Sequence, residues 1–267
     1  MNDAPAVTKA VIMARGLGTR MRRANAGAPL SPEQDAIAAQ GMKGMIPVGR
    51  PFMDYILSAL ADAGVRKVCL IIGPEHRMVR EYYENVELKR LDRISFAVQQ
   101  EPAGTANAVL AAESFAGPDN FLVLNSDNYY PIAACRELCR MDGPGLVAFS
   151  IRELVAGGIP EERVRAFPRI VRGENGCLSR LSIEDSANEG RVSMNIWRFS
   201  SHIFTACRAI QASPNGEWEL PVAVAFAVDH LGECFRVIEC DGAVLDVSSR
   251  ADIAGVAQRL ASTAVAL

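Results

Sequence analysis

The sequence predicts an α/β protein in which helices flank a mostly parallel central sheet. Short runs of apolar, β-branched residues alternate with helical patterns of about a dozen residues through the first half of the chain. A glycine loop directly follows the first of these runs, and two later runs each bring an aspartate to their carboxyl end. Parallel strands place their carboxyl ends at one edge of the sheet, where ligands bind in such folds.

The first half supplies strands and helices in strict alternation. Apolar, β-branched residues predict strands at residues 9–13, 67–73, 94–100, 121–125 and 145–151. Helical patterns lie between them at residues 52–63, 76–84, 105–115 and 132–140. Residues 24–42 form a long connection rich in small residues, proline and glycine. We expect it to be either a lid-like functional loop or an exposed insertion without a role.

The second half changes character and becomes richer in strands. Strands are predicted at residues 164–172, 177–183, 192–199, 234–240 and 243–247. Helices are predicted at residues 202–212 and 220–231, and a C-terminal helix begins at about Arg250. Because neither a low-complexity linker nor an internal repeat separates the halves, we expect one domain over residues 1–267, with halves 1–150 and 151–267.

The composition excludes several classes of protein. Apolar residues make up 49% of the chain and charged residues 22%, which is typical of a soluble globular protein. The net charge of -3 gives no reason to expect a nucleic-acid partner. The chain has no apolar run of the ~18 residues that span a membrane, and the N-terminus shows no secretion signal. We therefore expect a cytoplasmic protein without a membrane partner.

The seven cysteines form no Cys-x-x-Cys pair, and the three histidines show no metal-ligand spacing. Cys135 and Cys139, four positions apart on a predicted helix, are typical of two small core residues. We expect neither a zinc site nor a disulfide scaffold.

Residues 14–23, ARGLGTRMRR, place two glycines and three arginines directly after the first strand. The stretch lacks the third glycine of a dinucleotide-binding fingerprint and the Gly-Lys-Ser/Thr of a P-loop. What remains is a glycine loop whose backbone N–H groups can hold phosphate oxygens, with Arg20 beside them. On this signal alone, a plain surface turn is the alternative interpretation.

Four further stretches favour the phosphate-binding interpretation. Residues 42–57 open with Lys43, and residues 99–112 pass from a strand into a helix through Pro102-Ala-Gly104-Thr105. Residues 121–131 and 243–253 deliver Asp127 and Asp246 to strand ends. Together with the glycine loop, these stretches resemble the sugar-phosphate nucleotidyltransferase family over residues 9 to about 260. The combination of Gly-x-Gly-Thr-Arg, Lys-x-x-x-Pro and Gln-x-x-Pro-x-Gly-Thr-Ala carries the resemblance.

The resemblance implies a Rossmann-like, GT-A-like nucleotidyltransferase fold with a smaller β-rich sugar-binding part. It makes residues 1–150 the nucleotide-binding half and residues 151–267 the acceptor-binding half. It assigns Arg20 to the leaving pyrophosphate, Lys43 to the reacting phosphates, and Gln99 with Gly104 to the base edge, which is typical of uracil or thymine. The residues that it places against the nucleotide are Ala14, Gly16, Leu17, Gly18, Thr19, Gln99, Pro102, Gly104, Thr105 and Ser126.

The resemblance also implies Mg²⁺ as the cofactor, held by Asp127 and Asp246. It places Glu184, Asp185 and Asn195 against the acceptor, and it implies a nucleoside triphosphate and a sugar-1-phosphate as small-molecule partners. The formation of a homo-oligomer is left open. These residue types suit the chemistry, because two anionic reactants need Mg²⁺, Arg20 and Lys43 to meet.

Each assignment has a simpler structural alternative. Asp127 can cap the following turn, and Asp246 can be an acidic residue at the start of a helix. Gln99 can be an exposed polar residue at the end of a strand, and Gln100 is then the competing candidate for its role. Arg22 and Arg23 fit solvated surface positions better than catalytic ones.

Three departures from the family pattern are visible. Arg15 occupies a position where the family has glycine or alanine, and Ser126 precedes Asp127 in place of glycine. The third departure is Asp185, which stands where the family has a lysine that contacts the acceptor phosphate. Either Asp185 turns outward and a nearby arginine supplies the charge, or the acceptor itself carries a cation. The candidate arginines are Arg165, Arg169 and Arg180.

The leading hypothesis is Mg²⁺-dependent transfer of a nucleoside monophosphate from UTP or dTTP to a sugar-1-phosphate. One alternative is a cytidylyltransferase that uses a small phosphorylated amino alcohol or another non-hexose phosphate. A second is a nucleotide-sugar-dependent glycosyltransferase, although Asn125-Ser126-Asp127 supplies only one acid of its Asp-x-Asp motif. A third is a catalytically weak nucleotide sensor.

Overall fold

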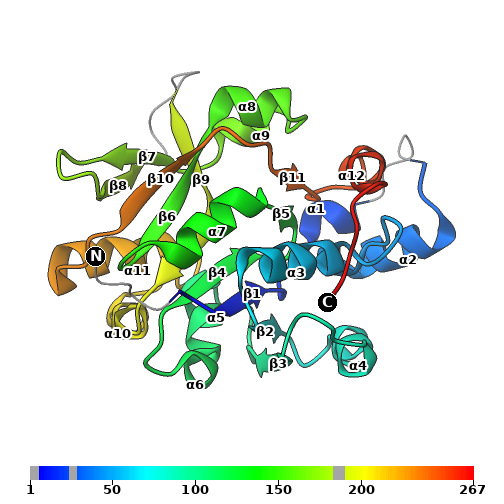
Figure 1. Cartoon of the computed structure of the whole chain (residues 1–267), viewed down its shortest axis with the longest axis horizontal. Helices are drawn as coiled ribbons and strands as arrows, with labels where there is room; N and C mark the ends of the chain where they lie inside the picture. Colours follow the sequence, from blue (N-terminus) through cyan, green and yellow to red (C-terminus); the bar gives the residue numbers. More distant parts are fainter. Residues whose placement is uncertain (1–5, 24–28, 183–189) are drawn as a thin grey trace.

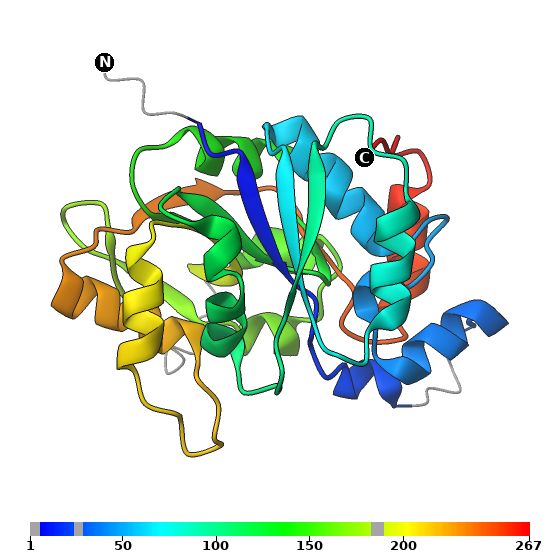
Figure 2. The same ribbon diagram turned by 90° about the horizontal axis from the view of Figure 1, so that it is seen from below.

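A mixed sheet forms the centre of the protein, and helices cover both of its faces (Figures 1 and 2). The computed structural model describes residues 6–23, 29–182 and 190–267. The main path of the sheet has the strand order β10-β6-β9-β4-β1-β2-β3. Its strands are β1 (Lys9–Met13), β2 (Lys67–Ile72), β3 (Arg93–Val98), β4 (Phe121–Asn125), β6 (Gly145–Ser150), β9 (Arg191–Phe199) and β10 (Arg236–Cys240).

The strands of the main path are parallel except at β9. β1 pairs in parallel with β2 and β4, β2 with β3, and β6 with β10, whereas β9 is antiparallel to both of its neighbours, β4 and β6. The predicted α/β fold with a mostly parallel core sheet is confirmed. Two strands beside β9, β7 (Arg169–Arg172) and β8 (Leu178–Ser182), form an antiparallel pair. A separate two-stranded sheet joins β5 (Asn128–Tyr129) to β11 (Leu245–Asp246).

The two faces of the sheet bury two separate hydrophobic cores. Side chains alternate along β1, so that Ala10 and Ile12 pack into one core while Val11 and Met13 pack into the other. The first core is covered by α3 (Phe52–Ala63), α4 (Arg77–Asn85), α7 (Ile132–Arg140) and α12 (Asp252–Leu260). The second is covered by α5 (Thr105–Ala111), α6 (Glu113–Ala116), α10 (His202–Ala209) and α11 (Leu220–Leu231). None of the helices formed by the described residues has the length and apolar character needed to cross a membrane.

The structure contains short helices that the sequence analysis missed. Within residues 24–42, α2 (Pro32–Gln40) begins with a capping box, because the side chain of Ser31 accepts from the backbone of Gln34 and the side chain of Gln34 accepts from the backbone of Ser31. The prediction of one structureless connection is therefore wrong from Pro32 onward, while residues 24–28 lie outside the described ranges. Short segments also form α1 (Thr19–Arg22) and the 3₁₀ turn η1 (Lys43–Met45).

The predicted strand at residues 164–172 is correct only at its end. Val164 belongs to α9 (Glu161–Arg165), and β7 begins at Arg169. α9 follows α8 (Ile151–Ala156) and starts after Pro160, with two glutamates in its first turn. Acidic residues stabilise the positive end of a helix, so the start signal was present in the sequence. The predicted helix at residues 105–115 is interrupted at Ala112, which separates α5 from α6.

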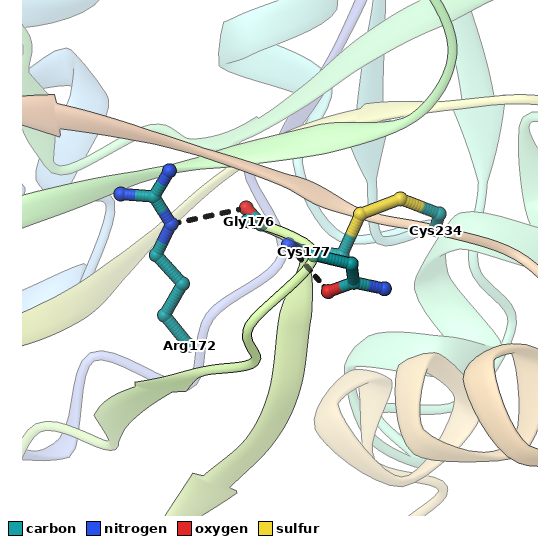
Figure 3. Close-up of a disulfide and its surroundings, with 5 residues drawn as sticks. Arg172, Gly176, Cys177 and Cys234 are labelled. Carbon is teal, nitrogen blue, oxygen red and sulfur yellow. Dashed lines mark hydrogen bonds between the residues drawn. A yellow bond between two sulfur atoms is a disulfide. The ribbon is translucent and has the colours of Figure 1, made fainter.

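A disulfide joins Cys177 to Cys234, which are 57 positions apart in the sequence (Figure 3). Pairing between the start of β8 and the chain leading into β10 brings them together, because the backbone N–H of Leu178 donates to the carbonyl of Phe235. Their Cα atoms are 5.5 Å apart, within the usual range for a disulfide. The cysteine spacing gave no sign of this bond, because the pairing depends on strand contacts between distant segments.

The carboxylate of Asp54 on α3 is completely buried and connects α3 to α4. It accepts hydrogen bonds from the hydroxyls of Tyr82 and Tyr83, each at 2.9 Å, and from Nε of Arg50 at 3.0 Å. Burial, followed by the charge of Asp54, raises the pKa of Tyr83 well above its ordinary value, so the hydroxyl stays protonated and donates. A buried charge with these donors fixes how the two helices pack.

We expect Tyr83→Phe to destabilise the protein by about 1.5–3 kcal/mol, because it removes a hydrogen bond to a buried charged group. The matched control is Tyr55→Phe, since the buried Tyr55 donates to the neutral carbonyl of Val48 and should lose only ~1 kcal/mol. Denaturant unfolding of both variants measures the difference. Equal losses would contradict a charged acceptor at Asp54.

Candidate active site

A cavity of about 640 Å³ lies at the carboxyl ends of β1, β3 and β4. Parallel strands expose unpaired backbone groups and side chains at this edge, which is where the sequence analysis expected ligands. The sequence-predicted residues that line this cavity are Ala14, Gly16, Leu17, Gly18, Thr19, Arg20, Lys43, Gln99, Pro102, Gly104, Thr105, Ser126 and Asp127.

The glycine loop forms one wall of the cavity. Gly18 has φ 60° and directly precedes α1. A Cβ atom at Gly18 would lie 2.4 Å from the backbone oxygen of Gly41, so no side chain fits there. A Cβ atom at Gly16 would meet nothing within 4 Å. The two glycines therefore differ: Gly18 is required by the fold, whereas Gly16 leaves open space toward the cavity.

Lys43 and Asp127 form an ion pair at the edge of the cavity. The ammonium of Lys43 donates to Oδ2 of Asp127 at 2.8 Å, and each side chain is about 20% exposed. η1 reaches Asp127 because Gly44 lies directly against Ser126, where a Cβ atom would be 3.2 Å from the backbone oxygen of Ser126. The pair thus places one cation and one carboxylate where a phosphate chain can enter.

Gln99 also lines the cavity, and only 5% of its surface is exposed. Its side-chain NH₂ donates to the carbonyl of Gly104 at 3.0 Å and to Oδ1 of Asn107 at 2.9 Å. The backbone carbonyl of Gly104 can only accept, so it fixes the orientation of the amide. Gln99 therefore has its side-chain oxygen, a hydrogen-bond acceptor, available to a ligand.

Arg15, one of the departures from the family pattern, also lines the cavity. Its guanidinium donates to the backbone carbonyl of Gln99 and to Glu75, with Nε 3.3 Å from the carboxylate. It therefore ties the glycine loop to the ends of β2 and β3.

Asp246 lies beside Asp127 but lines a different cavity, together with Arg163 and Asp252. The backbone N–H of Val247 donates to the carbonyl of Asp127 at 2.9 Å, and Asp246 pairs in register with Asn128, the residue after Asp127. Burial, followed by the charge of Asp127, raises the pKa of Asp246, and Arg163 opposes this shift.

Both oxygens of the Asp246 carboxylate are engaged. Oδ1 accepts from the side-chain amide of Asn128 at 3.0 Å and from the hydroxyl of Ser248 at 2.9 Å. Oδ2 accepts from Nη1 of Arg163 at 2.7 Å. By contrast, Oδ1 of Asp127 accepts no hydrogen bond from the described residues.

The two aspartates fit a magnesium ion in their chemistry and in part in their arrangement. Mg²⁺ takes oxygen ligands and keeps several waters, so one oxygen from each of two carboxylates is sufficient. The described residues contain no group of three or more His, Cys, Asp or Glu side chains suited to a metal. Asp127 offers an open oxygen, whereas Oδ2 of Asp246 is already held by Arg163.

Among the predicted acceptor residues, Asn195 is described by the structure, and it does not line the cavity. Glu184 and Asp185 lie outside the described ranges, so the orientation of Asp185 is not described. Asn195 lies on β9 where its register with β6 shifts, and it is the single described non-glycine residue with positive φ, at 58°. Its side-chain oxygen accepts from the indole of Trp197 at 3.2 Å. Backbone conformations of this kind cost energy and occur often at functional sites.

One wall of the cavity comes from a distant segment that the sequence analysis missed. Glu217, which precedes α11, lines the cavity. Its neighbour Trp218 donates from its backbone to Ala103 and accepts from the backbone of Ala106, each at 2.8 Å. Figure 2 shows this segment projecting beside the loop that follows β3. The other additional lining residues are Met13, Arg15, Gly41, Ala108, Asn125 and Ser248.

Comparison with known proteins agrees with this geometry. Residues 9–141, which supply the glycine loop, Lys43, Gln99 and Asp127, match the family model described as nucleotidyl transferase. These residues form a domain of this family.

Two relatives illustrate the similarity. A protein named UTP–glucose-1-phosphate uridylyltransferase AglF from Haloferax volcanii is 25% identical over 94% of this chain and 96% of its own length. A glucose-1-phosphate thymidylyltransferase from Streptomyces griseus is 25% identical over 83% of this chain but only 57% of its own length. A solved structure of UDP-glucose pyrophosphorylase complexed with UDP-glucose shares the fold, with a TM-score of 0.72 at 16% identity over 97% of this chain and all of that one.

We expect Gly18→Ala and Gly16→Ala to separate folding from ligand binding. Gly18→Ala forces a Cβ into the backbone of Gly41 and should lower the melting temperature by several degrees, as a loss of ~1–3 kcal/mol does. Gly16→Ala should leave the melting temperature unchanged but weaken nucleotide binding by about tenfold, because its Cβ occupies space next to the phosphates. Thermal melts with and without UTP measure both effects. Unimpaired UTP binding by Gly16→Ala would remove Gly16 from the proposed phosphate wall.

Proposed function

We propose that this nucleotidyl transferase family member moves a uridylyl or thymidylyl group from UTP or dTTP to a sugar-1-phosphate, with Mg²⁺ as the cofactor. The observation that carries the proposal is the composition of one cavity. Its lining combines a glycine loop that can hold phosphate oxygens, the ion pair of Lys43 and Asp127, and the side chain of Gln99. The arrangement suits an elongated anionic ligand with a flat polar base.

The proposed reaction joins two phosphate compounds. An oxygen of the sugar phosphate attacks the α-phosphorus of the nucleoside triphosphate, the bond to the β-phosphate oxygen breaks, and pyrophosphate leaves. The N–H groups after β1 hold the departing phosphates and Arg20 neutralises their charge. Lys43 bridges the two reacting phosphates, and Mg²⁺ adds positive charge when Asp127 and Asp246 hold it. Positioning and charge neutralisation supply the rate, since no protein nucleophile is needed.

The orientation of Gln99 supports a uracil or thymine base. Its free side-chain oxygen can accept a hydrogen bond from the N3–H that both of these bases carry. Cytosine presents an acceptor at N3, so two acceptors would face each other in a buried site. This favours UTP and dTTP over the CTP of the alternative hypothesis. The names of the uridylyl and thymidylyl relatives agree with this preference.

Glucose-1-phosphate is the first acceptor to test, since both relatives are named for it. The cytoplasmic location, the oligomeric state and the effect of Asp185 stay predictions. A panel of four nucleoside triphosphates against several sugar-1-phosphates and amino-alcohol phosphates, assayed for pyrophosphate release, tests the proposal. Release with UTP or dTTP and a sugar-1-phosphate supports it. Pyrophosphate release only with CTP and an amino-alcohol phosphate contradicts it. Nucleotide binding without any pyrophosphate release would favour the alternative of a catalytically weak nucleotide sensor.

We expect Asp127→Asn to lower kcat by about 10²-fold or more while leaving the fold intact, because the side chain keeps its shape but loses the negative charge that would hold Mg²⁺. Steady-state pyrophosphate release and a thermal melt measure the two effects. The control is Asp119→Asn, since Asp119 also pairs with a lysine, Lys9, but is 61% exposed and lies away from the cavity. A near wild-type kcat for Asp127→Asn would exclude Asp127 from the reacting centre.

A further inference from the structure

Arg163 bridges two carboxylates beside the proposed reacting centre. Its Nη1 lies 2.7 Å from Oδ2 of Asp246 and 3.1 Å from Oδ2 of Asp252, and its side chain is 13% exposed. Arg163 lies on α9, of which the sequence analysis predicted only the last two residues, as the start of a strand, and no earlier observation assigned Arg163 a role. Nothing in the family pattern described above includes it.

The two carboxylates depend on Arg163 to different degrees. Oδ2 of Asp252 also accepts from the backbone N–H groups of Ser248 and Ser249, and from the hydroxyl of Ser249. Asp252 therefore remains well satisfied without Arg163. Oδ2 of Asp246 has Arg163 as its single donor among the described residues. Removing the guanidinium would free this one oxygen.

The charges around this oxygen suit a divalent cation when Arg163 is absent. Three carboxylates (Asp127, Asp246 and Asp252) face two cations, Lys43 and Arg163. Their formal charges sum to -1 with Arg163 and to -2 without it. The guanidinium of Arg163 thus supplies positive charge at Oδ2 of Asp246. A divalent cation bound to the same oxygen would supply that charge in its place.

We propose that Arg163 is a positioning residue that holds Asp246 Oδ2 in the metal-free protein and competes with a divalent cation for that oxygen. The guanidinium stabilises two neighbouring aspartates that would otherwise repel each other in a partly buried setting. Cation binding at Asp127 and Asp246 must displace Arg163 from Asp246, while its contact with Asp252 can persist. This inference rests on the proposed function only for the assignment of Asp127 and Asp246 as cation ligands.

The test is a titration with Mn²⁺, in which the electron paramagnetic resonance signal of the free ion reports binding without turnover. Arg163→Met removes the charge and keeps an unbranched side chain, and it should tighten Mn²⁺ binding by about tenfold. The matched control is Arg191→Met, because Arg191 also bridges two carboxylates, Glu239 and Asp241, each at 2.9 Å. Its Mn²⁺ affinity should equal that of the wild type.

The double variant Arg163→Met with Asp246→Asn should lose the tighter Mn²⁺ binding of Arg163→Met, since residue 246 no longer carries a negative charge. Equal or weaker Mn²⁺ binding by Arg163→Met, or an equal gain in Arg191→Met, would overturn the proposal. If Arg163→Met does not fold, Arg163→Gln keeps a donor for Asp252 without the charge and is titrated in the same way. Failure of the proposed function would appear separately, as absent pyrophosphate release from a wild type whose Mn²⁺ titration still responds to Arg163→Met.

Discussion

The ion pair between Lys43 and Asp127 links η1 to the end of β4, and the shape of the cavity depends on this link. Asp127 follows a buried strand and is fixed by the sheet, whereas Lys43 follows the inserted helix α2 and has no strand to hold it. The close approach of Gly44 to Ser126 removes the space between them. An anionic ligand entering this edge meets a cation that the carboxylate already orients, so little side-chain freedom is lost on binding.

The same electrostatic constraint shapes the neighbouring sheet of β5 and β11. Pairing these strands brings Asp246 next to Asp127, and two carboxylates in a partly buried place repel unless cations accompany them. Lys43 pairs with Asp127, and Arg163 pairs with Asp246. Helix α9 is thus connected to the reacting centre through charge, although it lies outside the segment that matches the family model.

Sequence patterns were sufficient where local chemistry decides the structure. β1, β4, α3, α7 and α11 have the predicted bounds, because each combines a strong apolar pattern with clear turn residues at its ends. The glycine loop, Lys43, Gln99 and Asp127 were predicted from their residue types and line one cavity. The partners of Asp246 and the disulfide of Cys177 could not be predicted, because each contact joins segments whose proximity depends on the complete sheet. Glu217 was missed for the same reason.

The position of β9 has a consequence for synthesis of the chain on the ribosome. β9 separates β6 from β4, so β6 has no partner strand from the first 150 residues. A nascent chain of that length can pair β4, β1, β2 and β3, but it leaves the edge of β4 and the whole of β6 exposed. Unpaired edges of this kind invite association with other chains. β9 joins β4 to β6 only after residue 199 has emerged, so the residues that line the cavity acquire their final support late in translation, and the growing chain needs protection until then.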